Sequence, residues 1–190
     1  MQKLITSFRV FIICTILFGL IYSLLMAGIG QIIFPHQANG SLLMRNDKVI
    51  GSTLIAQEFT SPKYFHSRFS AINYNAASSG GSNLAPSSKK LIDLTKDHIQ
   101  QIRLENGLST DLQLPADIAL SSASGLDPQI SWDNAMLQLP RVAKQRGLSE
   151  KKLKRIVRAN TSHDFVGIWG QEAVNVLELN LALDELGNNK

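Results

Sequence analysis

An apolar run within the first forty residues limits how this chain can be organised. Between Val10 and Phe34 no side chain carries a charge, and Ile, Leu, Phe, Val and Met dominate the run. A helix of this length is roughly 37 Å long at about 1.5 Å per residue, more than the roughly 30 Å hydrocarbon core of a bilayer. Because a helix satisfies its own backbone hydrogen bonds in lipid, residues 10–34 are predicted to form one transmembrane helix.

The charges that flank this run predict its orientation. Lys3 and Arg9 precede it, whereas the next charged residue after it is Arg45. The positive-inside rule then predicts a cytoplasmic stub at residues 1–9 and an extracytoplasmic domain at residues 35–190, in the plasma membrane or in the inner membrane of a Gram-negative cell. The alternative is a cleaved secretory signal, but the run is longer than a signal's apolar region and the segment 27–30 is a weak cleavage site.

Composition restricts what the outer domain can be. About 150 residues suffice for one well-packed domain. Without Lys3 and Arg9 the chain holds 17 basic and 15 acidic residues, a balance too even for a nucleic-acid-binding surface. The single cysteine, Cys14, lies in the apolar run, so no disulfide is expected to stabilise the domain.

Hydrophobic patterns predict a mixed α/β fold for the outer domain. Residues 41–44 and 49–56 are typical of two strands joined by a turn at 45–48, which together form a hairpin. The stretch 61–88 is rich in Ser, Asn and Gly and shows no clear period, but its aromatic residues favour an ordered loop over disorder. The C-terminal stretch 174–186 fits both a strand and a helix, and the sequence leaves both open.

Helix start and stop signals divide the remainder of the domain. A helix is expected from Ser87 or Ser88 to Asn106–Gly107, and Pro115 is expected to open a short turn. Further helices are predicted from Ser131 to about residue 137, from Pro140 to residue 146, and from residue 149 onward; proline favours the first turn of a helix over its interior.

Two loop motifs are candidates for chemistry. In the first, Ser79, Gly80, Gly81, Ser82 and Asn83 form a glycine-rich segment whose N–H groups are of the kind that cradle anions, but it lacks the Lys and Ser/Thr of a phosphate-binding loop and also fits a plain turn. The second motif contains Ser124 and Asp127, which would suit a nucleophile beside a carboxylate. It lacks a nucleophile elbow, and an Asp before Pro is typical of a structural turn.

The remaining charged and metal-ligating residues give weaker signals. The four histidines show no metal-ligand spacing, so no metal site is expected: His36, His66, His98 and His163. The densest basic run fits a solvated helix face, although it would also suit an acidic neighbour or anionic headgroups: Lys144, Arg146, Lys151, Lys152, Lys154, Arg155 and Arg158.

The order of five sequence blocks identifies a family. In chain order they are GSTLIAQEF, SPKYFHSRFSAINYNAASSGGSNLAPSS, SASGLDPQIS, QLPRVAKQRGLS and VNVLELNLALD. Behind one N-terminal span, this order closely resembles the C-subunit family (KdpC) of the Kdp potassium-transporting P-type ATPase, over essentially the whole chain. Small departures occur at Phe69, where the family usually has Pro, at Ala85, usually Gly, and at Gln129, often His.

The resemblance implies an accessory, non-catalytic subunit. Its partners would be a channel-like subunit, an ATP-hydrolysing subunit and a small peptide, and potassium would be transported by the complex without binding here. The family is described as a catalytic chaperone that raises the ATP affinity of the hydrolysing subunit. This implies ATP as a ligand, with Gln138 as a nucleotide contact and the segment from Ser79 to Asn83 compared with a nucleotide-binding signature.

The predicted topology conflicts with direct ATP binding. It places Gln138 and Ser79 outside the cytoplasm, where ATP is scarce, and favours a domain that caps the potassium-entry side of the channel-like subunit and stabilises assembly. Two other classes stay open from the residues alone. One is a membrane-anchored envelope enzyme that uses Ser124 and Asp127, and the other is an independent extracytoplasmic binding module.

Overall fold

The computed structural model describes residues 1–162 and 170–188. The chain separates into two compact units, Met1–Ile50 and Gly51–Lys190, and each is described by itself. The sequence predicted divisions after residues 9 and 34, where the chain would enter and leave a membrane. The boundary between the two units lies after Ile50 and reflects contacts within the chain, so it does not test those divisions, which stay a prediction.

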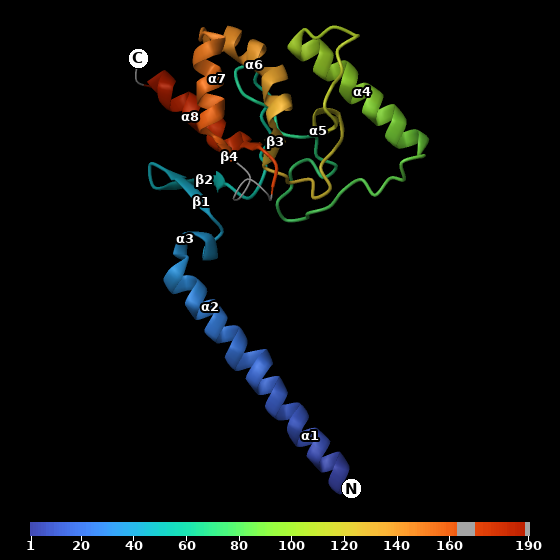
Figure 1. Ribbon diagram of the computed structural model, residues 1–190, viewed down its shortest axis with the longest axis vertical. Helices are drawn as coiled ribbons and strands as arrows, with labels where there is room; N and C mark the ends of the chain where they lie inside the picture. The colour runs from blue at the N-terminus through green and yellow to red at the C-terminus, as the bar shows by residue number, and fades with distance from the viewer. Residues whose placement is uncertain (163–169, 189–190) are drawn as a thin grey trace. The chain divides into compact units, whose positions relative to one another are not determined.

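The first unit begins with one continuous helix, from Gln2 to Ile33 (Figure 1). It is built from α1 (Gln2–Cys14), a π-helical stretch η1 (Thr15–Ile21) and α2 (Tyr22–Ile33), and none of these contains a buried side chain. By length and composition this helix is able to cross a membrane. The predicted apolar helix is therefore confirmed, and it starts several residues earlier than the uncharged run.

A short helix, α3 (Pro35–Ala38), and a hairpin follow. The hairpin pairs β1 (Leu42–Arg45) with β2 (Lys48–Ser52). Asn46 and Asp47 form its two-residue turn, both with positive φ, as a twisted hairpin requires. The predicted second strand, 49–56, was too long. It ends at Ser52, whose hydroxyl accepts a hydrogen bond from the Leu54 N–H and turns the chain out of the sheet.

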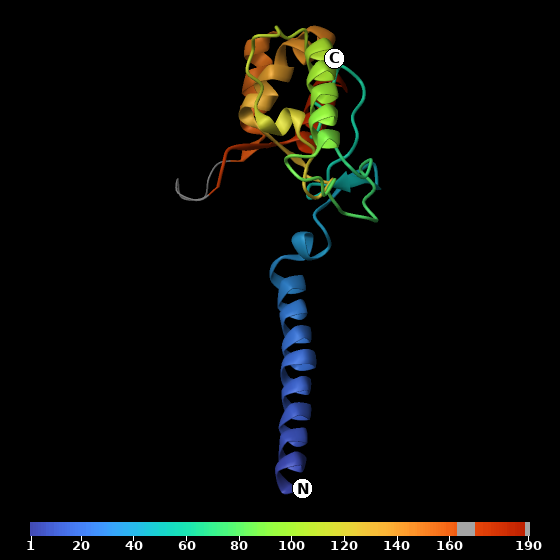
Figure 2. The same ribbon diagram turned by 90° about the vertical axis from the view of Figure 1, so that its right-hand side faces the viewer.

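The second unit packs helices around a small antiparallel sheet. The strand order is β3 (Gln129–Ser131), β5 (Ala173–Asn175), β4 (Thr161–Ser162), with β5 in the centre. Ile130 pairs with Val174, and Thr161 pairs with Val174 on the other side. In both views α4 (Lys89–Asn106) lies beside α6 (Trp132–Arg146) (Figures 1 and 2). A mixed fold of helices and a small sheet confirms the predicted class.

The core of this unit lies between three helices, the sheet and the 61–88 loop. The helices are α6 (Trp132–Arg146), α7 (Glu150–Ala159) and α8 (Val176–Asn188). Completely buried side chains from all of these parts meet there: Phe65, Ile130, Val142, Leu153, Val157, Val174, Leu179 and Leu183. A smaller cluster forms where α4 contacts α5 (Ala116–Ala119), around Ile102 and Ile118.

Helix α6 corrects one prediction. It runs unbroken from Trp132 to Arg146 with Pro140 inside it, whereas the sequence suggested that one helix ends before Pro140 and another starts there. A proline inside a helix costs about 3 kcal/mol. Leu139 and Val142 on either side are buried in the core, and each such side chain contributes roughly 1.5–3 kcal/mol, so the packing of both halves outweighs the proline.

Most predicted helix ends are confirmed. Ser88 precedes α4 and Gly107 ends it in the left-handed conformation, while Ser149 caps α7 by accepting a hydrogen bond from the Lys152 N–H. The two patterns in 174–186 are both present in sequence order, because β5 ends at Asn175 and α8 follows directly, with Val176 in the helix.

Candidate functional site

Gln138, the residue linked to nucleotide binding by resemblance, lies inside the fold. Its side chain is on α6 and the residue is only 4% exposed. Its Oε1 accepts from the His66 N–H (2.7 Å) and from Arg141 Nη2 (2.9 Å), and its Nε2 donates to the His66 carbonyl (3.1 Å) and to Asn134 Oδ1 (2.8 Å). An amide side chain offers two donors and two acceptor lone pairs, so all four positions are occupied by the protein itself.

Asn180 on α8 makes the equivalent contact with Phe65, the residue before His66. Its Oδ1 accepts from the Phe65 N–H and its Nδ2 donates to the Phe65 carbonyl, both at 2.9 Å. Two side-chain amides, Asn180 and Gln138, therefore pair with the backbone of consecutive residues, Phe65 and His66, as two neighbouring strands would. This arrangement holds the Phe65 ring in the core, where it is fully buried.

Two arginines hold the carbonyls that precede this pair. Arg141 Nη1 donates to the carbonyls of Pro62 (2.6 Å) and Tyr64 (3.0 Å), and Arg146 Nε donates to the carbonyl of Lys63 (2.7 Å). The five carbonyls of residues 62–66 thus all accept hydrogen bonds from side chains of α6 or α8. We call residues 62–66 the clamped segment.

The buried surroundings of the clamped segment change two pKa values. Burial, followed by the charge of Arg141, lowers the pKa of His66, against the opposing effect of the Ser61 carbonyl and of Glu105, whose Oε2 lies 3.5 Å from His66 Nδ1. Burial also lowers the pKa of the Arg141 guanidinium. Each ring nitrogen of His66 faces an acceptor oxygen, since Nε2 lies 3.2 Å from the Ser61 carbonyl and Nδ1 lies 3.5 Å from Glu105 Oε2.

The glycine-rich candidate segment packs against the second loop motif. The Gly80 N–H donates to the Ser124 carbonyl (2.8 Å), and the Ser79 hydroxyl donates to the same oxygen (3.1 Å). A Cβ on Gly81 would lie only 2.7 Å from the Ala123 carbonyl oxygen. Glycine is needed at 81 because two backbones approach closely, and the Gly80 N–H is used within the protein rather than presented to an anion.

The other members of that segment face outward. Ser82 and Asn83 are exposed, and Asn83 has a positive φ of 52°, a conformation that asparagine tolerates in turns. The structure therefore brings Ser79, Gly80 and Gly81 to the Ser124 loop, and it places none of the segment's five residues in hydrogen-bond contact with Gln138.

Ser124 and Asp127 both serve turns of their own loop. The Ser124 hydroxyl accepts from the Leu126 N–H (3.1 Å). Asp127 accepts from Arg68 Nη1 (2.9 Å) with one oxygen and from the Gln129 N–H (3.1 Å) with the other. These contacts support the structural interpretation of the motif over a nucleophile.

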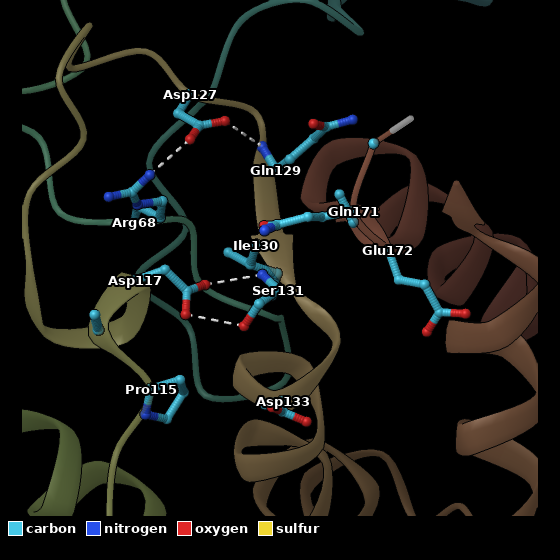
Figure 3. A pocket seen from close by; sticks show the side chains of 13 residues that line it. Arg68, Pro115, Asp117, Asp127, Gln129, Ile130, Ser131, Asp133, Gln171 and Glu172 are labelled. Atoms are coloured by element: carbon cyan, nitrogen blue, oxygen red, sulfur yellow. Dashed lines mark hydrogen bonds and ion pairs between the residues drawn. The ribbon is translucent and has the colours of Figure 1, made fainter. Parts of the chain in front are cut away.

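Asp127 and Arg68 also line a pocket of the second unit, about 780 Å³ in volume (Figure 3). Three more carboxylates line it, those of Asp117, Asp133 and Glu172. With four carboxylates and one guanidinium, its field is negative. A cleft lined by one sign of charge attracts ligands of the opposite sign, so this pocket does not suit a triphosphate.

The sequence interpretation missed Asp117, which organises one wall of this pocket. Asp117 accepts from the Ser131 N–H (2.8 Å), the Ser131 hydroxyl (2.9 Å) and Asn134 Nδ2 (3.0 Å), and so fastens α5 to the start of α6.

The sequence interpretation also missed Asn180. A lone Asn among Leu177, Leu179 and Leu183 in an apolar helix signals a buried hydrogen-bonding role, because an unpaired buried amide is costly.

The histidines occupy separate places. His98 on α4 stacks on Phe69, with ring centroids 3.6 Å apart, and its Nδ1 lies 2.8 Å from the Ala119 carbonyl. His36 is exposed, and His163 lies outside the described residues. Among residues 1–162 and 170–188, no three His, Cys, Asp or Glu side chains are grouped in a way that could hold a metal ion.

The basic run splits between the core and the surface. Arg146 is tied to the clamped segment and to Asp184 (2.9 Å), whereas the basic residues of α7 are exposed. Part of α7 forms, together with one tryptophan, a groove of about 470 Å³ that we call the α7 basic surface, lined by Trp132, Lys151, Lys154, Arg155 and Arg158.

Comparison with known proteins gives one consistent result. The family described as K+-transporting ATPase, c chain, matches residues 4–185. A protein of Mycobacterium tuberculosis (strain H37Rv) named "Potassium-transporting ATPase KdpC subunit" is 44% identical over 187 residues, which cover 97% of this chain and 99% of the relative. Proteins of the same name from Rhodopseudomonas palustris (strain BisB18) and Koribacter versatilis are 47% and 44% identical, over 90% and 96% of this chain and 91% and 94% of their own lengths. A family match over nearly the whole chain, together with relatives of this identity, shows that the chain belongs to the KdpC family, the C subunit of the potassium-transporting ATPase.

Proposed function

We propose that this subunit acts in the potassium-transporting ATPase through assembly rather than through a nucleotide site of its own. Its N-terminal helix would dock on transmembrane helices of the complex, and its second unit would cap the potassium-entry side of the channel-like subunit. The ATP-hydrolysing subunit and the small peptide would complete the assembly. Membership of the KdpC family supports the complex, and the hydrogen bonding of Gln138 supports the non-nucleotide role.

The observation that carries the proposal is the full use of the Gln138 amide. An ATP contact at this position would have to replace one of four internal hydrogen bonds and expose a side chain that is 4% exposed. Breaking such a bond without a substitute leaves a buried polar group unpaired, which costs about 1–3 kcal/mol. Gln138 is therefore better suited to holding the clamped segment than to reading a ligand.

The experiment compares two variants that damage the same segment from opposite sides. Gln138→Ala removes the amide that pairs with His66, and Asn180→Ala removes the one that pairs with Phe65. Of these two residues, only Gln138 is implied as a nucleotide contact by the family resemblance. Wild-type and variant complexes are purified with all subunits, and the ATPase rate is measured against ATP concentration.

The proposal predicts the same outcome for both variants. Each should lower the yield of intact complex, and in the complexes that do assemble, the KM for ATP should match that of the wild type. A rise in KM for Gln138→Ala that Asn180→Ala does not share would establish a nucleotide contact and refute the assembly-only role. Equal KM values with a normal yield from both variants would show that the clamped segment is not needed for assembly.

A further inference from the structure

Helix α7 concentrates the positive charge of this protein. Its ten residues include five basic side chains and one acidic side chain, so its net charge of +4 equals that of the whole chain. Leu153 and Val157 fasten the helix to the core, where both are fully buried. The basic side chains occupy the other side of the helix and are exposed. The basic and acidic residues in the rest of the chain are equal in number, so α7 accounts for the net positive charge.

The α7 basic surface combines these cations with an aromatic ring. Lys154 Nζ lies 6.0 Å and Arg158 Cζ 5.2 Å from the centre of the Trp132 ring, distances at which a cation is attracted to the ring. Arg158 is also bound to both carboxylate oxygens of Glu172, at 2.9 and 3.0 Å. The arginine is therefore positioned before any ligand arrives.

Three cations of this surface form no ion pair with any residue that the structure describes. Within residues 1–162 and 170–188, no ion pair involves Lys151, Lys154 or Arg155. Like charges gathered in one groove repel each other, and an anion that enters relieves the repulsion. The groove thus favours an anionic group, and the tryptophan in its lining favours one that is attached to apolar material.

An anionic phospholipid satisfies both conditions. Its phosphate is an anion, and tryptophan is enriched at the boundary between headgroups and acyl chains. Clusters of Lys and Arg close to a membrane bind anionic lipids. This chain carries a helix able to cross a membrane, so its second unit is tethered to the surface in question. We propose that the α7 basic surface docks on anionic phospholipid headgroups of the membrane that holds the chain.

The test uses the full-length chain in lipid nanodiscs. The chain has two tryptophans, so replacing Trp169 by Phe leaves Trp132 as the sole tryptophan reporter. Nanodiscs are made from phosphatidylcholine alone or with phosphatidylglycerol, and in each the lipid carries bromine on the upper part of its acyl chains to quench nearby tryptophan. Quenching of Trp132 should be stronger with phosphatidylglycerol and should weaken in high salt, because salt screens the charges.

Paired variants separate this surface from general charge. Lys151→Gln with Arg155→Gln removes two cations of the groove, and Lys89→Gln with Lys90→Gln removes two exposed cations of α4. Each basic residue near an anionic surface contributes about fivefold to binding, or about 1 kcal/mol, so the first pair should weaken the docking equilibrium about 25-fold and the second pair should leave it unchanged. Thermal unfolding of each variant confirms that the fold is intact.

Three outcomes would overturn the proposal. Equal quenching in both lipid mixtures would show that lipid charge has no role. Equal loss in both variant pairs would show that the effect follows total charge and not this surface. Quenching that is absent in every nanodisc, with Trp132 shielded only in the assembled complex, would assign the surface to an acidic subunit instead.

Discussion

Replacing Gln138 by alanine tests how the clamped segment is held. The variant removes four hydrogen bonds of 2.7–3.1 Å and leaves their partners facing a buried void: the backbone N–H and carbonyl of His66, the Arg141 guanidinium and the side-chain Oδ1 of Asn134. At about 1 kcal/mol for each bond, the loss is about 4 kcal/mol. Domains of this size have about 5–15 kcal/mol of stability in total, so the variant should be folded but weakened severely.

Urea unfolding of the full-length chain in detergent micelles, followed by tryptophan fluorescence, measures this loss. With a denaturant slope of about 2 kcal/mol per molar, 4 kcal/mol lowers the midpoint by about 2 M. The matched control is Gln145→Ala, which removes the same side chain from an exposed position of the same helix. Its stability should change by no more than about 0.5 kcal/mol.

One result would refute the reasoning. If Gln138→Ala shifts the midpoint no more than Gln145→Ala does, the Gln138 amide does not pair with the His66 backbone in solution. Position 138 would then be free to contact a ligand, and the family's nucleotide interpretation would gain support.

Three further predictions concern pH, packing and orientation. Burial, followed by the charge of Arg141, lowers the pKa of His66, so between this lowered pKa and the ordinary histidine pKa of about 6.5 the unfolded chain binds more protons than the folded chain. The stability of the fold should therefore be full above pH 6.5 and fall as the pH drops toward the lowered pKa. His66→Gln should flatten this fall in urea titrations. Gly125→Ala should cost about 2–4 kcal/mol in the same assay, because φ is +69° and the new Cβ would lie 2.5 Å from an isoleucine carbon, whereas Gly187→Ala, with open space around it, should not destabilise. A reporter fused after Lys190 should read as extracytoplasmic, as the charge flanks of the apolar run predict; a cytoplasmic reading would contradict the topology and return direct ATP binding to consideration.

Local patterns in the sequence were enough to predict several elements of this protein. The uncharged run predicts the long N-terminal helix, and Ser88, Gly107 and Ser149 mark the ends of α4 and α7. These features depend on residues within one or two helical turns, whose capping and hydrophobic spacing act regardless of the surroundings. The order of the sequence blocks was likewise enough to indicate the family.

Tertiary contacts decided the rest. Pro140 remains inside α6 because both halves of that helix are buried, which no local signal reveals. The backbone of residue 66 is paired with a side chain 72 residues away, and that of residue 65 with one 115 residues away. Likewise, the glycines at 80 and 81 meet the loop of Ser124 more than forty residues along the chain. A polar side chain or a glycine has the same local pattern whether it meets a ligand or another part of its own chain, so only the folded structure distinguishes the two.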